Sequence, residues 1–385
     1  MIAVARRTDR PVVGVSRAHH LDPRDHKARK ILLADKRNRS ENIPSLHLRS
    51  TAEMLAEFAF LGEEEARRIV IETPRAIFDS LEPVSPLPKG FFPPIIDGAA
   101  EELRAHTMKG ATELYAGEDG TLPELVGKSI EKELNAIIGN GFAVLYLIAM
   151  RLCISSRAAG YVVGSRGSVG SSIVAFLTGI TEVNPLPPHY RCLVCRRTEF
   201  VEPGPGTGAA GSGPGACGPD LKKKECCGGL MVRDGYRIPF EAFMGLDGTK
   251  VPDIDLNFAG EYQAKAMAEI ESTFGKEHVF RAGTISTLKE RNAAGFVLKY
   301  LEEHALTWRR AEVERFARSI TEVARTTGQH PGGIVIIPRD KEMSDFMPVH
   351  RPADSESADN VTTHFDFHSY EGTVVKVDVL GHDAP

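Results

Sequence analysis

The sequence predicts a mixed α/β fold, and three observations support this prediction. Val251–Phe258 alternates apolar and polar residues with the period of two that a half-buried strand requires. The apolar run 373–380 is typical of a buried strand. Longer segments between such strands, for example 99–115 and 260–274, have the patterns of helices. Strands and helices therefore alternate along one chain.

Length, charge and cysteine content limit the class of protein. A chain of 385 residues can bury a sizeable core and is expected to hold two or three domains. The net charge of -5 and the pI near 6.3 give no overall signature of a nucleic-acid binder, so any basic surface must be local. The most apolar run, 142–154, is too short to span a bilayer and includes Arg151. We therefore expect a cytoplasmic protein without a membrane contact.

Near the start of the chain, a predicted strand at 11–15 leads into His19 and His20. Two histidines at the end of a strand can bind a metal, but two histidines in a loop are also typical of a solvated surface. Both interpretations stay open. Predicted helices at 51–61 and 63–81 follow, and the proline-rich stretch 82–94 then indicates a domain boundary.

After this boundary come predicted helices at 99–115, 125–138 and 142–158, and then a loop rich in glycine and serine at 160–172. A strand, a glycine-rich turn and a helix N-terminus can together bind phosphate, because successive N–H groups form a cradle for an anion. A flexible turn is the alternative. The candidate phosphate-binding residues are Gly164, Ser165, Arg166, Gly167, Ser168, Gly170 and Ser171.

Five of the six cysteines cluster in a predicted insertion, which suits a metal site in a reducing compartment better than a disulfide framework. Cys192 and Cys195 have the spacing of a zinc knuckle, whereas the second pair, Cys226 and Cys227, is adjacent. Cys217 is an alternative ligand. The site either binds zinc or has decayed, and the Gly/Pro-rich stretch 202–219 between its halves is predicted to be a mobile loop.

Beyond Phe258, helices are predicted at 260–274, 287–304 and 310–321, and a loop at 325–333 then leads into a strand at 334–337. The loop combines Arg325, Gln329 and His330 with glycines, which suits a second wall facing phosphate. The helical region contributes further candidate phosphate contacts, although a charged helix face is usually only solvated. These are Arg281, Lys289, Arg291, Lys299, Arg309, Arg310, Arg315 and Arg318.

The predicted strand at 251–258 directs Asp253 and Asp255 to one face, where two carboxylates can share a hard cation. A third carboxylate comes from Asp378, inside the apolar strand 373–380, where an unpaired charge would be costly. Asp366 is the rival, on a more polar segment. Three carboxylates around two Mg²⁺ ions can activate a hydroxyl and stabilise leaving pyrophosphate, which is the chemistry of nucleotidyl transfer.

Six motifs, in order, closely resemble the C-family bacterial replicative polymerases of the PolC-type DNA polymerase III alpha kind. They are GYVVGSRGSVGSS, TEVNPLPPHYRC, KVPDIDLNF, FRAGTIST, RTTGQHPGG and VKVDVLGHD. The resemblance implies a nucleotidyltransferase-type palm of the polymerase β superfamily and a DNA-directed DNA polymerase that uses two Mg²⁺ ions and, through the cysteines, Zn²⁺. It identifies Asp253, Asp255 and Asp378 as the catalytic aspartates.

The resemblance also implies a domain order. Residues 1–95 resemble the C-terminal part of a PHP domain, with His19 at a metal-ligand motif. Residues 96–259 resemble the first part of the palm, with the zinc-knuckle insertion at 188–232. Residues 260–321 resemble a helical thumb that grips primer-template DNA, and 322–385 the second part of the palm.

The chain departs from the family in two respects. Lys224 stands where the second zinc knuckle should have its first cysteine. The fingers, the exonuclease and the regions that bind the sliding clamp and the replisome are not recognised in this sequence, so we expect a partial chain that is inactive alone. The alternatives are a non-catalytic partial product that binds nucleotide or DNA at most, and a DnaE-type member of the family.

Overall fold

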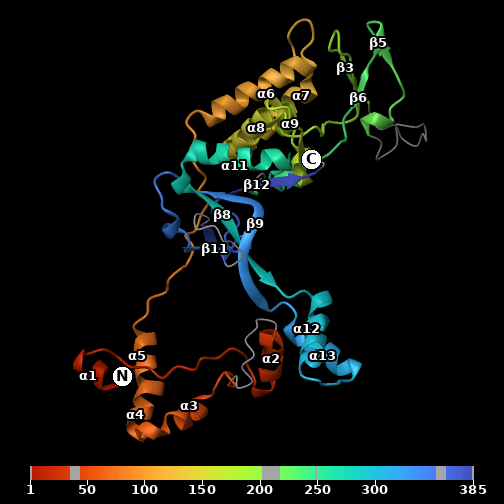
Figure 1. The fold of residues 1–385 in the computed structure, drawn as a ribbon. Helices are drawn as coiled ribbons and strands as arrows, with labels where there is room; N and C mark the ends of the chain where they lie inside the picture. The colour runs from red at the N-terminus through yellow and green to blue at the C-terminus, as the bar shows by residue number, and fades with distance from the viewer. Residues whose placement is uncertain (1, 35–43, 202–216, 248, 353–360, 384–385) are drawn as a thin grey trace. The chain divides into compact units, whose positions relative to one another are not determined.

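The computed structural model describes residues 2–34, 44–201, 217–247, 249–352 and 361–383 (Figure 1). The chain divides into two compact units. One comprises Pro86–Thr284 and Thr327–Pro385, and the other comprises Met1–Ser85 and Ile285–Thr326. Each unit thus joins two stretches that lie far apart in the sequence. We call them the sheet unit and the helical unit.

The sheet unit is built on a seven-stranded mixed sheet with the strand order β1-β7-β12-β9-β8-β11-β10. β12 pairs in parallel with β7 and antiparallel with β9, and β1 pairs antiparallel with β7. This mixed sheet confirms the predicted α/β class. The strands are β1 (Val163–Arg166), β7 (Asp255–Ala259), β8 (Val279–Thr287), β9 (Ala324–Ile336), β10 (Val349–His350), β11 (Thr362–Asp366) and β12 (Val375–His382).

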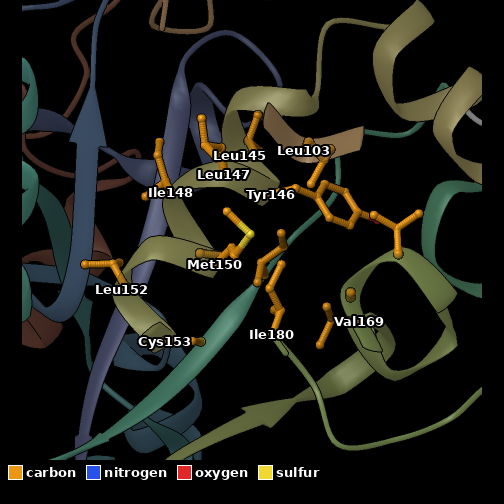
Figure 2. Packing of buried hydrophobic residues seen from close by; sticks show 14 of the residues in the cluster. Leu103, Leu145, Tyr146, Leu147, Ile148, Met150, Leu152, Cys153, Val169 and Ile180 are labelled. Carbon is orange, nitrogen blue, oxygen red and sulfur yellow. The ribbon is translucent and has the colours of Figure 1, made fainter. Parts of the chain in front are cut away.

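Helices cover one face of this sheet. α11 contacts both β12 and α8, and Figure 1 shows α6 to α9 gathered beyond it. α8 is buried at most positions, and Figure 2 shows its Tyr146 and Met150 packed with Leu103 and Ile180. The helices are α6 (Ala99–Tyr115), α7 (Glu124–Gly139), α8 (Ala143–Ala158), α9 (Ile173–Leu177), α10 (Glu241–Met244) and α11 (Gly260–Phe274).

The two faces of the central strands differ in polarity. Leu256 and Phe258 of β7 belong to the main core cluster together with Val377 and Val379 of β12. Because side chains alternate along a strand, Asp255 and Asp378 must lie on the opposite face. The helices therefore cover the apolar face, and the carboxylates lie on the other one.

A three-stranded sheet and a small hairpin form the insertion. The sheet has the order β3-β2-β6, and β4 pairs with β5. Asn184 joins the insertion to α6, because its side-chain amide donates hydrogen bonds to Tyr115 and Asp234. The predicted loop at 202–219 falls mostly outside the described residues. The strands are β2 (His189–Arg191), β3 (Thr198–Phe200), β4 (Glu225–Cys226), β5 (Gly229–Leu230) and β6 (Val232–Asp234).

The helical unit packs α2 against α12 and α13 around a core of its own, which includes Ile31, Val297 and Ile320. The nitrogen of Lys27 on α2 lies 4.0 Å from the ring centroid of Trp308. The helices are α1 (Ile2–Arg7), α2 (His26–Ala34), α3 (Thr51–Glu57), α4 (Glu63–Arg67), α5 (Thr73–Asp79), α12 (Glu290–Glu303) and α13 (Arg310–Ile320). A π-helical segment, Arg68–Glu72, connects α4 to α5.

Three local predictions were wrong. Residues 11–15 form no strand, because this segment has no neighbouring strand and its described backbone contact is the bond from Gly14 N–H to the Ile69 carbonyl. The predicted loop at 325–333 is part of the long strand β9. The segment 260–321 is also not one helical body, since β8 interrupts it and α11 packs on the sheet unit.

In the described part of the chain, no single helix is long and apolar enough to cross a membrane. α7 and α8 pass that test only as a pair, bent by 111° at their junction.

Candidate active site

Three carboxylates meet at the centre of the sheet unit. Asp255 is the first residue of β7, and its direct partner across the parallel pairing is Asp378 of β12. Asp253 lies two residues before Asp255 on the same face. One carboxylate oxygen from each residue lies within 4.8 Å of the others. The register of two strands thus brings together the three aspartates that the sequence selected.

Partial desolvation of this cluster raises the cost of its negative charge, since Asp378 is buried and Asp255 is half-buried, while Asp253 is exposed at the edge. Desolvation raises the pKa of Asp253, and the charge of Asp378 adds to this shift while Lys376 opposes it. Burial, followed by the charges of Asp253 and Asp378, raises the pKa of Asp255 to about 6. Three carboxylates so close to one another repel, and this repulsion favours a bound cation.

Asp378 supplies the clearest evidence that the cluster suits a metal ion. Its side chain is buried, and Oδ1 has no hydrogen-bond partner among the described residues. A buried carboxylate oxygen without a partner carries a desolvation cost that a metal ion can offset. Oxygen ligands of this kind suit hard cations such as Mg²⁺. The cluster therefore fits a divalent metal.

Lys376 lies in this site although the sequence analysis did not select it. Its ammonium donates to Oδ2 of Asp378 at 2.6 Å and lies 4.2 Å from the ring centroid of Phe367. Lys376 and Asp378 are two residues apart on β12, so they share a face. The two-residue spacing of Lys376 and Asp378 was visible in the sequence and could have identified the lysine.

His330 covers the cluster from β9. Its Nδ1 accepts a hydrogen bond from the Gly333 N–H at 2.6 Å and lies 3.8 Å from Oδ1 of Asp378. Burial lowers the pKa of His330, which favours the neutral ring with its proton on Nε2. A Cβ at Gly333 would lie 2.7 Å from that Nδ1, and a Cβ at Gly332 would lie 2.4 Å from the Val379 carbonyl oxygen. Gly332 is therefore required for the close packing of β9 on β12, and Gly333 for the position of the His330 ring.

Asp366, the rival third carboxylate, lies outside this cluster. It is the last residue of β11, and its Oδ1 accepts hydrogen bonds from the backbone N–H and the ring of His368. The structure thus brings Asp378 rather than Asp366 to the other two aspartates.

The glycine- and serine-rich segment lies next to the carboxylates. Arg166 ends β1 opposite Asp255, and its guanidinium lies 3.5 Å from Oδ2 of that aspartate. Arg166, Gly167 and Ser168 are exposed, whereas Gly170 and Ser171 are buried. The predicted phosphate-binding turn therefore exposes residues 166–168 beside the carboxylates and buries residues 170–171. Gly164 and Ser165 lie on β1, where the Ser165 hydroxyl donates to Thr181.

The N-terminus of α9, which the sequence analysis expected to face phosphate, holds a carboxylate of the protein itself. Glu133 is buried and accepts hydrogen bonds from the backbone N–H groups of Ile173 and Val174 and from the Ser172 hydroxyl. Burial raises the pKa of Glu133 to about 7. These N–H groups are consequently not open to an external anion.

The other predicted contacts are dispersed. On β8, the neighbours of Arg281, Phe280 and Ala282, pack in a separate hydrophobic cluster, so the Arg281 side chain lies on the opposite face of the strand. Its main charged neighbour is Glu271 of α11. Burial lowers its pKa. Arg325 belongs to the helical unit, where its guanidinium carbon lies 4.4 Å from the ring centroid of Phe296. Gln329 is half-buried beside His330 on β9.

Four cysteines form the second group of candidate ligands. The sulfurs of Cys192, Cys195, Cys226 and Cys227 lie within 4.8 Å of one another. Cys227 and Gly228 both have positive φ, as a type I′ hairpin turn between β4 and β5 requires. This turn lets two adjacent cysteines direct their sulfurs to one point. Backbone N–H groups of the first knuckle lower the pKa of Cys192 to about 7, which favours the thiolate that binds metal.

The remaining candidate ligands stand apart. The Cys217 thiol donates to Asp220 at 2.9 Å and is not in the cysteine group. Lys224 forms an ion pair with Glu199. Within the described ranges, neither His19 nor His20 belongs to a group of three or more candidate metal ligands.

Comparison with known proteins identifies the family of this chain. The family model for the bacterial DNA polymerase III alpha NTPase domain matches residues 101–311 and 301–381, most of the chain. The chain belongs to the bacterial DNA polymerase III alpha family. All three carboxylates and all four clustered cysteines lie inside the matched residues.

Several curated members of the DNA polymerase III alpha family are similar over almost the whole chain. A protein named DNA polymerase III PolC-type from Caldanaerobacter subterraneus subsp. tengcongensis is 53% identical over 344 residues, covering 89% of this chain and 24% of the relative. Proteins of the same name from Thermotoga maritima and Clostridium perfringens are 52% and 49% identical, covering 99% of this chain and 27% and 26% of those relatives. The chain spans about a quarter of the length of these relatives.

Proposed function

We propose that this chain carries the nucleotidyl-transfer site of a replicative DNA polymerase. The reaction is template-directed addition of a deoxynucleoside triphosphate to the 3′-hydroxyl of a DNA primer. The observation that carries the proposal is the cluster of three carboxylates with an unpartnered oxygen on Asp378. The names of the similar relatives, DNA polymerase III PolC-type, support it.

Asp253, Asp255 and Asp378 would hold two Mg²⁺ ions. Bound there, the ions would favour deprotonation of the attacking hydroxyl and neutralise charge on the leaving pyrophosphate. Asp253 and Asp255 come from one strand segment and Asp378 from its neighbour, so the ligand spacing follows from the sheet itself. Little side-chain rearrangement is needed for the three to act together.

Basic side chains around the cluster would position the substrate and the ligands. Arg166 is exposed beside Asp255 and can grip phosphate oxygens of the incoming nucleotide at two points. The small neighbouring residues Gly167 and Ser168 would let the backbone beside Arg166 approach the phosphate closely. Lys376 fixes the orientation of Asp378 and offsets the repulsion among the carboxylates. His330 limits access of water to the buried side of Asp378.

The compact units suggest roles for the parts of the chain. We assign the palm to the sheet unit and the thumb, which would contact primer-template DNA, to α12 and α13. Residues 1–85 would be the C-terminal part of a PHP domain. The cysteine group would hold one structural Zn²⁺, with Cys226 replacing the ligand lost at Lys224. Sliding-clamp and replisome contacts, and activity itself, would belong to a longer cytoplasmic protein.

The test compares metal binding in three forms of this chain. Wild type, Asp255→Asn and Asp366→Asn are heated with Mg²⁺ and a deoxynucleoside triphosphate, and the unfolding midpoints are compared. We expect metal-dependent stabilisation of wild type and of Asp366→Asn, and none of Asp255→Asn. An equal response of Asp255→Asn, or no response of wild type, would contradict a metal site at the carboxylates.

A further inference from the structure

The helical unit contains a cavity that the polymerase reaction does not use. It has a volume of about 520 Å³ and is lined by residues from two stretches, 19–33 and 319–325, that belong to the same compact unit. This volume is within the range of small-molecule sites. The polar lining consists of His19, His20, Asp25, Arg29, Ser319 and Arg325.

The charged groups of the cavity are mostly basic. Asp25 is its acidic lining residue, and Oδ2 of Asp25 already accepts a hydrogen bond from the Asp22 backbone N–H. Arg29 and Arg325 bring two full positive charges to the lining. Adding a further positive charge is therefore unfavourable here, and an anion would be attracted.

Two buried polar atoms in this lining lack partners. Arg29 NH1 and His20 Nε2 are both buried, and neither has a hydrogen-bond partner among the described residues. The ring of His20 is oriented from its other side, since Nδ1 donates to the Asp22 carbonyl oxygen at 2.8 Å. A buried guanidinium N–H without an acceptor is costly, and an anion in the cavity would satisfy it.

The shape of the cavity also favours an anion. Apolar residues, among them Leu32, Leu33 and Val323, form the rest of the wall. In such a partly dry setting a charge-assisted hydrogen bond from arginine is stronger than in water. Phosphate oxygens match the planar guanidinium better than a single carbonyl group does.

We propose that this cavity binds a phosphate group, held by Arg29 with His20 beside it. The phosphate comes either from a small molecule or from the backbone of a nucleic acid. The site is separate from the carboxylate cluster, and its failure would leave the proposed polymerase function untouched.

The experiment titrates the whole chain with inorganic phosphate, at constant ionic strength, and follows binding by calorimetry. Arg29→Gln should weaken binding at least tenfold, because it removes one charge-assisted contact. Arg75→Gln removes the same charge from an exposed position of α5 outside the lining and should leave the affinity unchanged. Equal affinity of wild type and Arg29→Gln, or no phosphate binding by wild type, would overturn the proposal.

A second variant tests the site independently, in case Arg29→Gln does not fold. Ala324 is exposed and lines the cavity, so Ala324→Glu adds a carboxylate there without removing a contact. It should also weaken phosphate binding at least tenfold, and unchanged binding would contradict the site. A parallel titration with a short single-stranded oligonucleotide identifies the source of the phosphate. If Arg29→Gln weakens oligonucleotide binding more than Arg75→Gln does, the site takes a nucleic-acid backbone, and otherwise it takes a small phosphate.

Discussion

The two groups of candidate metal ligands are built in different ways. The carboxylates belong to adjacent strands of a seven-stranded sheet, and the main hydrophobic core holds the other face of those strands. The cysteines belong to turns at the ends of short strands, of which β4 and β5 have two residues each. Sheet register fixes the first group, whereas local turn geometry fixes the second.

This difference indicates what each group needs from its metal. The sheet itself brings the carboxylates together, so a bound ion would mainly relieve the repulsion among them. The cysteine region buries few large side chains of its own, so a metal there would contribute directly to local folding. Removing metal should therefore loosen the insertion while the sheet persists.

The largest effect is expected from the carboxylates on catalysis. In a polymerase of full family length, Asp253→Asn should lower the rate of nucleotide addition by about 10³-fold or more, because charge stabilisation of the transition state is lost. The fold should remain, since one repelling charge is removed. A primer-extension assay measures this, with Asp366→Asn as the control. Near-normal extension by Asp253→Asn would be incompatible with the assignment.

The next largest effect concerns zinc. Cys226→Ser should weaken Zn²⁺ binding by about 100-fold or more, because one of four thiolate ligands is lost. Cys217→Ser should have no effect, since its thiol is bonded to Asp220. Competition with a colorimetric chelator measures both affinities. If Cys217→Ser weakened binding as much as Cys226→Ser, the four-cysteine group would be wrong.

A third prediction distinguishes the stabilising effect of Lys376 from that of a bound metal ion. Lys376→Met should lower the free energy of unfolding by about 3 kcal/mol without metal, because it leaves a buried carboxylate unpaired. Mg²⁺ should restore much of this loss, since the ion replaces the missing cation. Lys250→Met, at an exposed position near Asp253, is the control. Denaturant titrations of wild type and both variants, with and without Mg²⁺, measure the free energies of unfolding. If Mg²⁺ leaves the loss in Lys376→Met unchanged, this would count against the metal site.

The smallest effect is a dependence of stability on pH. The pKa of Asp255 is raised to about 6, so between about pH 4 and 6 the folded state binds more protons than the unfolded state. In that window the metal-free protein should become less stable as the pH rises. Asp255→Asn should flatten this slope, while Glu133→Gln should flatten a slope that extends to about pH 7. Unfolding midpoints at successive pH values measure both slopes, and an unchanged slope in Asp255→Asn would contradict its raised pKa.

Much of the fold followed from local patterns. The helices Ala99–Tyr115 and Gly260–Phe274 have the predicted bounds, because each has a regular apolar face and a clear start and end. The strand at 11–15 failed because apolar β-branched residues predict a strand only where a neighbouring strand can pair. The loop at 325–333 failed for the opposite reason. Glycines usually mark turns, but here Gly332 permits close packing of β9 on β12 and Gly333 makes room for the His330 ring.

The sequence predicted the three aspartates of the site, but much of the arrangement around them could not be predicted. Period-two alternation selected Asp253 and Asp255, but only the register of β7 with β12 shows why Asp378 joins them. Glu133 could not be predicted, because its partners at Ile173 and Val174 lie in another helix. The turn geometry at Cys227, which brings the adjacent cysteines to one point, likewise could not be predicted from the sequence.

The parallel pairing of Asp255 with Asp378 also has a consequence for biosynthesis. β12 is the last strand of the sheet along the chain, yet it lies between β7 and β9. A ribosome would release β7 and β9 before the strand that must separate them, so the central gap stays open until β12 has been made. Insertion of β12 then brings the third negative charge against the first two. Mg²⁺ would therefore be expected to accelerate the insertion of this strand.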